Sequence, residues 1–406
     1  MTPEERLLRY AQIDTTSDPN SASVPSSARQ LDLLKVLKEE MIAMGVQEVV
    51  EDRGYLYGKI PSNLDHPVMS MGLIAHMDTS PDFCGGPVRP RKIERYDGAD
   101  IALNSEVVLK SAEFPEMARF VGHDLIVTDG NTLLGADDKA GIAEIMTVAE
   151  TLLTHPEIPH GEVCIAFTPD EEIGRGADGF DIAAFGADFA YTVDGGDAAG
   201  VCDETFNAAS ASVVVHGVSI HPGSAKNKMI NALNVAMEFH ALLPAQCRPE
   251  NTEGREGFNH LNRMEGNVEQ VRMEYIIRNH DAEEFARQKA LFAQAAQFLN
   301  ERAGRRLVEV AVTDSYYNMR EVLKDQEWIS EMAMQAVRDA GLQPFRESVR
   351  GGTDGARLTF MGLPCPNLGT GGANCHGRYE VCSIQQMHQV VQILMNLVAA
   401  ASQLKK

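Results

Sequence analysis

Residues 163–174 read VCIAFTPDEEIG. The apolar run 163–167 is rich in β-forming residues and lies between a glycine and a proline, a pattern typical of a buried strand. Three carboxylates, Asp170, Glu171 and Glu172, follow at its carboxyl end. Like charges this close repel each other, so a fold that gathers them requires a cation, a shared proton or full solvation. An isolated D-E-E is more often an acidic surface turn, so its meaning depends on the other strand ends.

Polar side chains also follow two other predicted strands. The apolar run 68–75 is followed by His76 and Asp78. These two side chains point the same way because successive residues of an extended chain alternate between faces. A further strand, 190–193, ends at Asp194. In an open α/β sheet, ligands bind at the carboxyl ends of the strands, so these side chains are predicted to meet.

Asp137 precedes a helix predicted over residues 140–153. Acidic residues at a helix start have an ordinary explanation as caps. The alternative is metal binding, since the two oxygens of Asp137 can bridge two cations, which would group it with Glu172. His376 lies in the loop GTGGANCHG. Histidines and carboxylates without paired cysteines suit zinc, cobalt or manganese, so the sequence predicts such a centre.

The composition limits the classes of protein that this chain can belong to. It has 406 residues, enough for a large core and two domains, and a net charge of −22, which argues against nucleic acid or an anionic membrane as a partner. No apolar run approaches the ~20 residues of a membrane span. The N-terminus lacks the basic-then-apolar order of a signal peptide. Seven cysteines, an odd number without a C-x-x-C pair, predict reduced thiols and a cytoplasmic location.

The order of predicted strands and helices indicates an α/β fold with a mixed, mostly parallel sheet flanked by helices. Residues 207–317 change character to β-α-β-β-α-β, which predicts a ferredoxin-like lid or dimerisation domain inserted between two parts of a catalytic domain, 1–206 and 318–406. Two copies are expected to form a homodimer through strand edges of this insert. The pattern also predicts a helix over 226–243 and a strand at 358–360.

The chemistry of such a centre follows from its donors. Two cations ~3.5–4 Å apart can share a water and lower its pKa, and a carboxylate beside that water can take its proton. The motifs HMDT, GADDKAG, TPDEEIG, TVDGG, HPGSAK, SYYNMR, RGGTDGA and LPCPNL are distributed in order over nearly the whole chain. In these motifs the chain resembles the peptidase T family, the tripeptide aminopeptidases among the co-catalytic zinc exopeptidases.

The resemblance implies two Zn²⁺ per subunit, with Co²⁺ or Mn²⁺ as substitutes. It makes His76 and Asp194 the terminal ligands of one zinc. Glu172 and His376 become the terminal ligands of the other zinc, and Asp137 becomes the bridge.

The resemblance also implies the catalytic roles and the substrate. Asp78 would orient His76 from behind, and Glu171 would act as general base and then as general acid. Small peptides are the implied substrates, and the implied reaction releases the N-terminal residue of a tripeptide.

Four further residues are predicted to touch the substrate. By resemblance, His221 reaches the scissile carbonyl as an electrophile; otherwise it is a histidine of a turn. Arg278, Asn318 and Arg350 are predicted to hold the carboxylate or backbone of the peptide, since an Arg fork suits a carboxylate. The two arginines have an equally good alternative as structural ion pairs.

Several other functions remain open. A dipeptidase, a carboxypeptidase or an N-acyl-amino-acid deacylase would use the same metal core, and a non-catalytic protein could keep the ligands for stability alone. The run GRGADG at 174–179 matches a dinucleotide fingerprint, but Asp170, Glu171 and Glu172 lie where a pyrophosphate would approach, so we exclude it.

Overall fold

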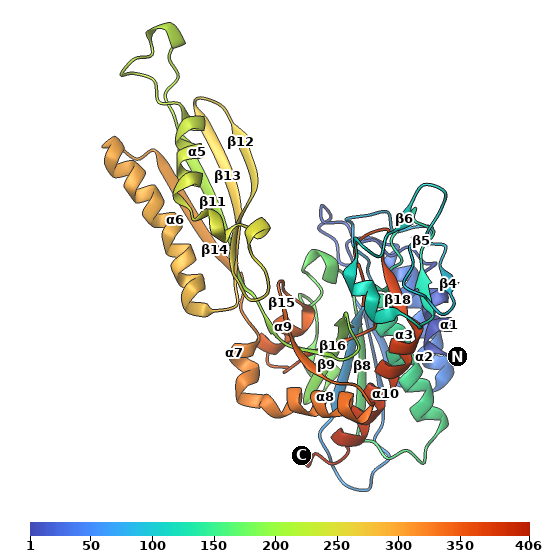
Figure 1. Ribbon diagram of the computed structural model, residues 1–406. Helices are drawn as coiled ribbons and strands as arrows, with labels where there is room; N and C mark the ends of the chain where they lie inside the picture. Colours follow the sequence, from blue (N-terminus) through green and yellow to red (C-terminus); the bar gives the residue numbers. More distant parts are fainter. The chain divides into compact units, whose positions relative to one another are not determined.

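The computed structural model describes residues 1–406, which divide into two compact units (Figure 1). Unit 1 comprises residues 1–203, 322–347 and 353–406. Unit 2 comprises residues 204–321 and 348–352, and the predicted insert 207–317 falls within it. None of the helices combines the length and apolar character that crossing a bilayer would require.

Unit 1 is organised around an eight-stranded sheet of order β1-β2-β8-β3-β9-β16-β10-β15. Its four central strands run parallel: β8 (Val163–Thr168), β3 (Met71–His76), β9 (Phe189–Gly195) and β16 (Asn367–Gly369). The antiparallel pairings β1–β2, β2–β8 and β10–β16 flank them. The outer strands are β1 (Gln47–Asp52), β2 (Tyr55–Ile60), β10 (Gly200–Thr205) and β15 (Phe345–Val349).

Helices cover both faces of this sheet, which explains why β3 and β8 are buried at every position instead of alternating. Leu73, Ile165 and Tyr191 belong to the core that contains α3 and α10, whereas Ile74 and Ala166 belong to the core of the opposite face. In Figure 1, α3 and α10 lie together beside the sheet. The helices of this unit are α1 (Pro3–Tyr10), α2 (Gln30–Met44), α3 (Ala136–Thr154), α4 (Ile182–Phe185), α8 (Glu327–Asp339), α9 (Asp354–Phe360) and α10 (Ile384–Ala401). The predicted fold class is therefore confirmed.

Two small sheets are also present outside the large one. One has the order β17-β18-β7-β4 and the other pairs β5 with β6. Four of these strands come from the segment that precedes α3, and they enclose an apolar cluster that includes Leu109, Phe120 and Val127. Their bounds are β4 (Arg91–Ile93), β5 (Ile101–Ala102), β6 (Val108–Leu109), β7 (Leu125–Val127), β17 (Gly372–Ala373) and β18 (Val381–Ser383).

Unit 2 has the predicted β-α-β-β-α-β order and is ferredoxin-like. Its sheet has the order β12-β13-β11-β14, and every pairing is antiparallel. The helices α5 and α6 contribute Phe239 and Phe292 to a core shared with Tyr275 of the sheet. The elements are β11 (Asn207–His216), α5 (Ala232–Leu242), β12 (Phe258–Gly266), β13 (Gln270–Asn279), α6 (Ala282–Ala303) and β14 (Val308–Tyr316), with a short α7 (Arg320–Leu323) after them.

Some predicted elements were wrong. The strand predicted at 358–360 is the end of helix α9, because the Thr353 hydroxyl caps that helix by accepting a hydrogen bond from the Ala356 amide. The helix predicted over 226–243 begins only at Ala232, where the Asn231 side chain caps it. The strands β10 and β15 were missed because both carry charged residues that resemble a loop.

Gly141 lets α3 approach the strand that delivers Asp194. A Cβ at this position would lie 1.9 Å from the carbonyl oxygen of Val193. We expect Gly141→Ala to lower the free energy of unfolding by about 1–3 kcal/mol through overpacking, measured by urea denaturation of the metal-free protein. Gly377→Ala is the control, since a Cβ there meets nothing within 4 Å. A stabilised Gly141→Ala variant, as helix propensity alone predicts, would contradict the close approach.

Glu144 makes stability depend on pH. Both of its carboxylate oxygens are buried in the structure without a hydrogen-bond partner, and burial raises its pKa well above 4.5. Between the unfolded and folded pKa values the folded state therefore binds more protons, so this contribution to stability falls as pH rises, by up to about 1.4 kcal/mol per pH unit. We expect Glu144→Gln to remove that slope in urea titrations between pH 5 and pH 8. The exposed Glu157→Gln serves as the control, and parallel curves for Glu144→Gln and the unmodified chain would contradict the expectation.

Candidate metal centre

Unit 1 brings histidines and carboxylates together at the carboxyl end of the parallel strands. Two groups of three side chains each present ligand atoms within 4.8 Å of one another. One group is His76, Asp137 and Asp194, and the other is Asp137, Glu172 and His376. Asp137 belongs to both groups, and Cys375 belongs to neither.

The two oxygens of Asp137 face different histidines. Its Oδ1 lies 3.1 Å from His76 Nε2, and its Oδ2 lies 3.2 Å from His376 Nε2. The terminal carboxylates complete each group. Asp194 Oδ1 lies 3.4 Å from His76 Nε2, and Glu172 Oε2 lies 2.9 Å from His376 Nε2. One carboxylate between two nitrogen–oxygen groups is the arrangement that a pair of cations requires.

The protonation of these groups supports the same conclusion. Burial raises the pKa of Glu172 to about 7 and that of Asp194 to about 6. Hydrogen bonds to Asp137 and Glu172 raise the pKa of His376 to about 11. Burial opposes a charged His76, but Asp194 and the other carboxylates around it raise its pKa well above 6.5. Protons are thus held where cations would lie.

The donor set fits divalent ions of the zinc type. It combines imidazole nitrogens with carboxylate oxygens and contains no thiolate, as in catalytic sites. Glu172 Oε1 is buried without a hydrogen-bond partner and is available as a ligand. The residues present therefore suit two bound cations, with Asp137 between them.

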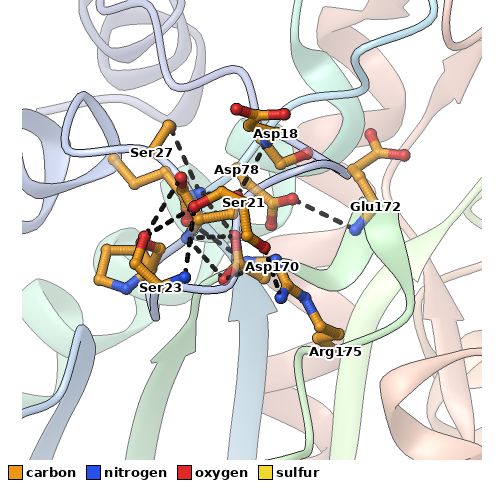
Figure 2. Close-up of polar contacts among 12 residues, drawn as sticks. Asp18, Ser21, Ser23, Ser27, Asp78, Asp170, Glu172 and Arg175 are labelled. Atoms are coloured by element: carbon orange, nitrogen blue, oxygen red, sulfur yellow. Dashed lines mark hydrogen bonds and ion pairs between the residues drawn. The ribbon is translucent and has the colours of Figure 1, made fainter.

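Asp78 connects two neighbouring strand ends. Its carbonyl oxygen lies 2.9 Å from His76 Nδ1, and its Oδ1 lies 3.4 Å from the same nitrogen. Its carboxylate also accepts a hydrogen bond from the main-chain amide of Glu171 at 2.9 Å. It accepts another from the main-chain amide of Glu172 at 3.2 Å (Figure 2). The sequence suggested only the contact between Asp78 and His76. The hydrogen bonds from Asp78 to the amides of Glu171 and Glu172 depend on strand register, which the sequence does not show. Asp78 therefore holds both a histidine and the acidic segment.

Glu171 lies partly buried beside the first donor group. It lines a narrow space with His76, Thr168, Asp194 and Asp354. Burial and then the charge of Asp194 raise its pKa well above 4.5. A carboxylate in this place can accept a proton from a group held at the metal centre.

Two buried carboxylates near the centre were not singled out from the sequence. Asp354 accepts a hydrogen bond from the Thr168 hydroxyl at 2.9 Å, and burial raises its pKa to about 7. Glu380 accepts hydrogen bonds from the main-chain amides of Leu134, Gly135 and Asp137, at 2.7, 2.8 and 3.0 Å. The motif RGGTDGA contains the first of them. No local pattern marks the second, because its partners lie more than 240 residues away.

The four predicted substrate-binding residues lie in unit 2, and each makes hydrogen bonds within that unit. Asn318 is buried, accepts a hydrogen bond from the Thr205 amide at 3.0 Å and donates to the His280 carbonyl at 3.1 Å. His221 is exposed, and its Nδ1 accepts from the Gly223 amide at 3.1 Å, which leaves Nε2 available. Substrate binding by these residues stays a prediction.

Both arginines predicted to hold the peptide donate to main-chain carbonyls of unit 2. Arg278 donates to Ile277 at 2.9 Å. Arg350 donates to Gly254 and Glu256, each at 2.9 Å. These hydrogen bonds go to main-chain carbonyls and are not ion pairs. Binding of a substrate carboxylate by either arginine stays a prediction.

The shared position of Asp137 has a direct consequence for metal content. If each group holds one divalent ion, Asp137→Ala is expected to lower the metal content to fewer than one ion per chain, because both groups lose a ligand at once. Asp194→Ala should leave one ion bound. Inductively coupled plasma mass spectrometry after dialysis measures both, with the fully exposed Asp65→Ala as control. Equal metal content in Asp137→Ala and Asp194→Ala would contradict a shared ligand.

Proteins of known structure share the fold of this chain. Residues 203–304 match the model of the peptidase dimerisation domain. The solved structures of similar fold include an aminopeptidase PepT from Bacillus cereus, with TM-score 0.78 and 23% identity over 99% of this chain and 98% of that one. They also include a dinuclear metal-binding peptidase of the M20 family from Bacillus subtilis, with TM-score 0.65 and 15% identity over 98% and 97% of the two chains.

Sequence similarity is much higher to curated relatives of nearly equal length. The chain is 50% identical to peptidase T of Clostridium acetobutylicum over 397 residues, 97% of each chain. It is 49% identical to peptidase T of a Geobacillus species over the same share of both chains. The resemblance in the sequence motifs is thereby confirmed, and the chain belongs to the peptidase T family.

Proposed function

We propose that this chain is a tripeptide aminopeptidase that hydrolyses the first peptide bond of its substrate at a two-metal centre, with zinc as the metal. The observation that carries the proposal is the position of Asp137 between two groups of ligand atoms. A single carboxylate shared by both groups would be a ligand of both cations.

In this proposal His76 and Asp194 hold one ion, Glu172 and His376 hold the other, and Asp137 holds both. When bound, such a pair lowers the pKa of a water and polarises a carbonyl oxygen. Asp78 keeps the ring of His76 oriented through its Nδ1.

Glu171 is proposed to move the proton. Its carboxylate takes a proton from the water that attacks the peptide carbonyl and then delivers it to the amine that leaves. The raised pKa of Glu171, caused by burial, supports the second step, because a weaker acid site holds the proton until the amine departs.

Other parts of the proposal concern assembly and location. We propose a homodimer formed through unit 2, supported by the match to a peptidase dimerisation domain and by the free edges of β12 and β14. The cytoplasmic location stays a prediction that rests on the odd number of cysteines and on the lack of a C-x-x-C pair in the sequence.

Glu171→Gln tests the catalytic core of the proposal. We expect the variant to retain two zinc ions but to lose about 10²- to 10⁴-fold in kcat on a free tripeptide, because the proton acceptor is absent. Chelation should abolish the activity of the unmodified chain, and added Zn²⁺, Co²⁺ or Mn²⁺ should restore it. A Glu171→Gln variant with full activity would favour the non-catalytic alternative.

An N-acetylated tripeptide tests the direction of cleavage. An aminopeptidase must hold a free α-amine, so we expect kcat/KM to fall at least about 100-fold when that amine is acetylated, the loss typical of a buried polar group left unpaired. Mass spectrometry identifies the released residue. Faster turnover of the acetylated peptide would identify a deacylase, and release of the C-terminal residue a carboxypeptidase.

A further inference from the structure

The three carboxylates of the D-E-E run point in different directions. Glu171 and Glu172 face the metal centre, whereas Asp170 contacts the serine-rich segment 17–27 and the start of α2 (Figure 2). Asp170 has φ 60° and ψ 24°, in the left-handed region that Asp and Asn adopt more readily than most residues. This conformation turns the chain between β8 and the short 3₁₀ helix of Glu171–Ile173.

Asp170 forms its hydrogen bonds on the side that faces away from the candidate metal centre. Its two carboxylate oxygens accept hydrogen bonds from the Ser26 amide at 3.0 and 2.8 Å, and Oδ1 accepts another from Gln30 Nε2 at 2.7 Å. The Asp170 amide donates back to Gln30 Oε1 at 3.3 Å. Asp170, Ser26 and Gln30 are all buried, so these bonds are shielded from water.

Other residues near Asp170 also form hydrogen bonds with the segment 17–27. Arg175 donates from Nη1 to the Ser21 carbonyl at 2.9 Å (Figure 2). Ser17 donates from its amide to the Thr79 carbonyl at 3.1 Å. On the other side of the run, Asp78 binds the amides of Glu171 and Glu172. The main chain of Glu171 is therefore fixed from both sides, by Asp170 before it and by Asp78 in front of it.

We propose that Asp170 is a positioning residue that, together with Gln30, sets the orientation of Glu171. The inference rests on the proposed function for the role of Glu171 as proton acceptor. Asp170 touches neither the metal ligands' donor atoms nor the space that Glu171 lines, so it acts through the main chain. Loss of the Asp170–Gln30 contact lets the turn relax, and a displacement of about 1 Å at a catalytic group lowers the rate by up to about 100-fold.

A charge exchange between the two partners tests the contact. Asp170→Asn keeps the left-handed turn, but its side-chain amide then faces the side-chain amide of Gln30 in place of a carboxylate. Gln30→Glu places a second carboxylate against Asp170. In the double variant the new amide faces the new carboxylate, so the hydrogen bond and the single negative charge are both restored. Asp18→Asn is the matched control, because it makes the same change at an exposed aspartate of the same segment.

We expect each single variant to lower kcat on a free tripeptide by about 10- to 100-fold. KM should stay within threefold and zinc content at the level of the unmodified chain. The double variant should recover to within threefold of the unmodified chain, and Asp18→Asn should match it throughout. If Asp170→Asn alone does not fold, the recovery from Gln30→Glu to the double variant decides the question.

Hydrogen exchange of the metal-free protein gives a readout that is independent of activity. The amides of Glu171 and Glu172 should exchange at least tenfold faster in each single variant and return to the original rate in the double variant. Unchanged kcat in Asp170→Asn, zinc loss that accounts for its lower kcat, or additive effects in the double variant would overturn the proposal. If Glu171→Gln stayed active, the proposed function would fail, and the exchange rates alone would decide whether Asp170 and Gln30 position the segment.

Discussion

Repulsion between buried carboxylates is the constraint on which the active end of this molecule depends. Parallel strands deliver their carboxyl ends to one edge of the sheet, and here β3, β8 and β9 end in His76, the D-E-E run and Asp194. Asp137 lies between both histidines. Such a cluster is stabilised by positive charge inside it, as protonated imidazoles or metal ions, or by protons on the carboxylates. The way the sheet is built therefore gathers the donor atoms that a metal ion would need.

Carboxylates that are not in the two ligand groups accept hydrogen bonds from main-chain amides near those groups. Asp78 binds the amides of Glu171 and Glu172, Glu380 binds those of three residues around Asp137, and Asp170 binds that of Ser26. A carboxylate that accepts amide hydrogen bonds is satisfied without a metal and leaves the ligand oxygens unobstructed. The acidic residues thus divide into those whose oxygens meet at the candidate metal centre and those that bind main-chain amides around it.

Much of the fold and most of the candidate centre could be predicted from local sequence. The strand ending at Phe167 and the following acidic run are short-range patterns, and the rule that parallel strands end together brings His76 and Asp194 to the same edge. The strand β15 could not be predicted, because its sequence FRESV is mostly polar. Helix α9 was missed because its apolar residues have the length of a short strand, and the Thr353 cap that starts the helix was not recognised. Glu380 and Gln30 carry no local signal, since their partners are set by long-range packing.

By itself, the sequence determined the residue types of the centre and the family, because ligand chemistry depends on side-chain identity and long ordered motifs rarely arise by chance. Only the tertiary structure decided where each acidic side chain of the D-E-E run points. Neighbours in sequence carry the same charge, but Asp170 turns away through a left-handed main chain while Glu171 and Glu172 face the candidate metal centre. The direction of a side chain is a property of the folded main chain, and the contacts that fix that direction join residues 140 positions apart.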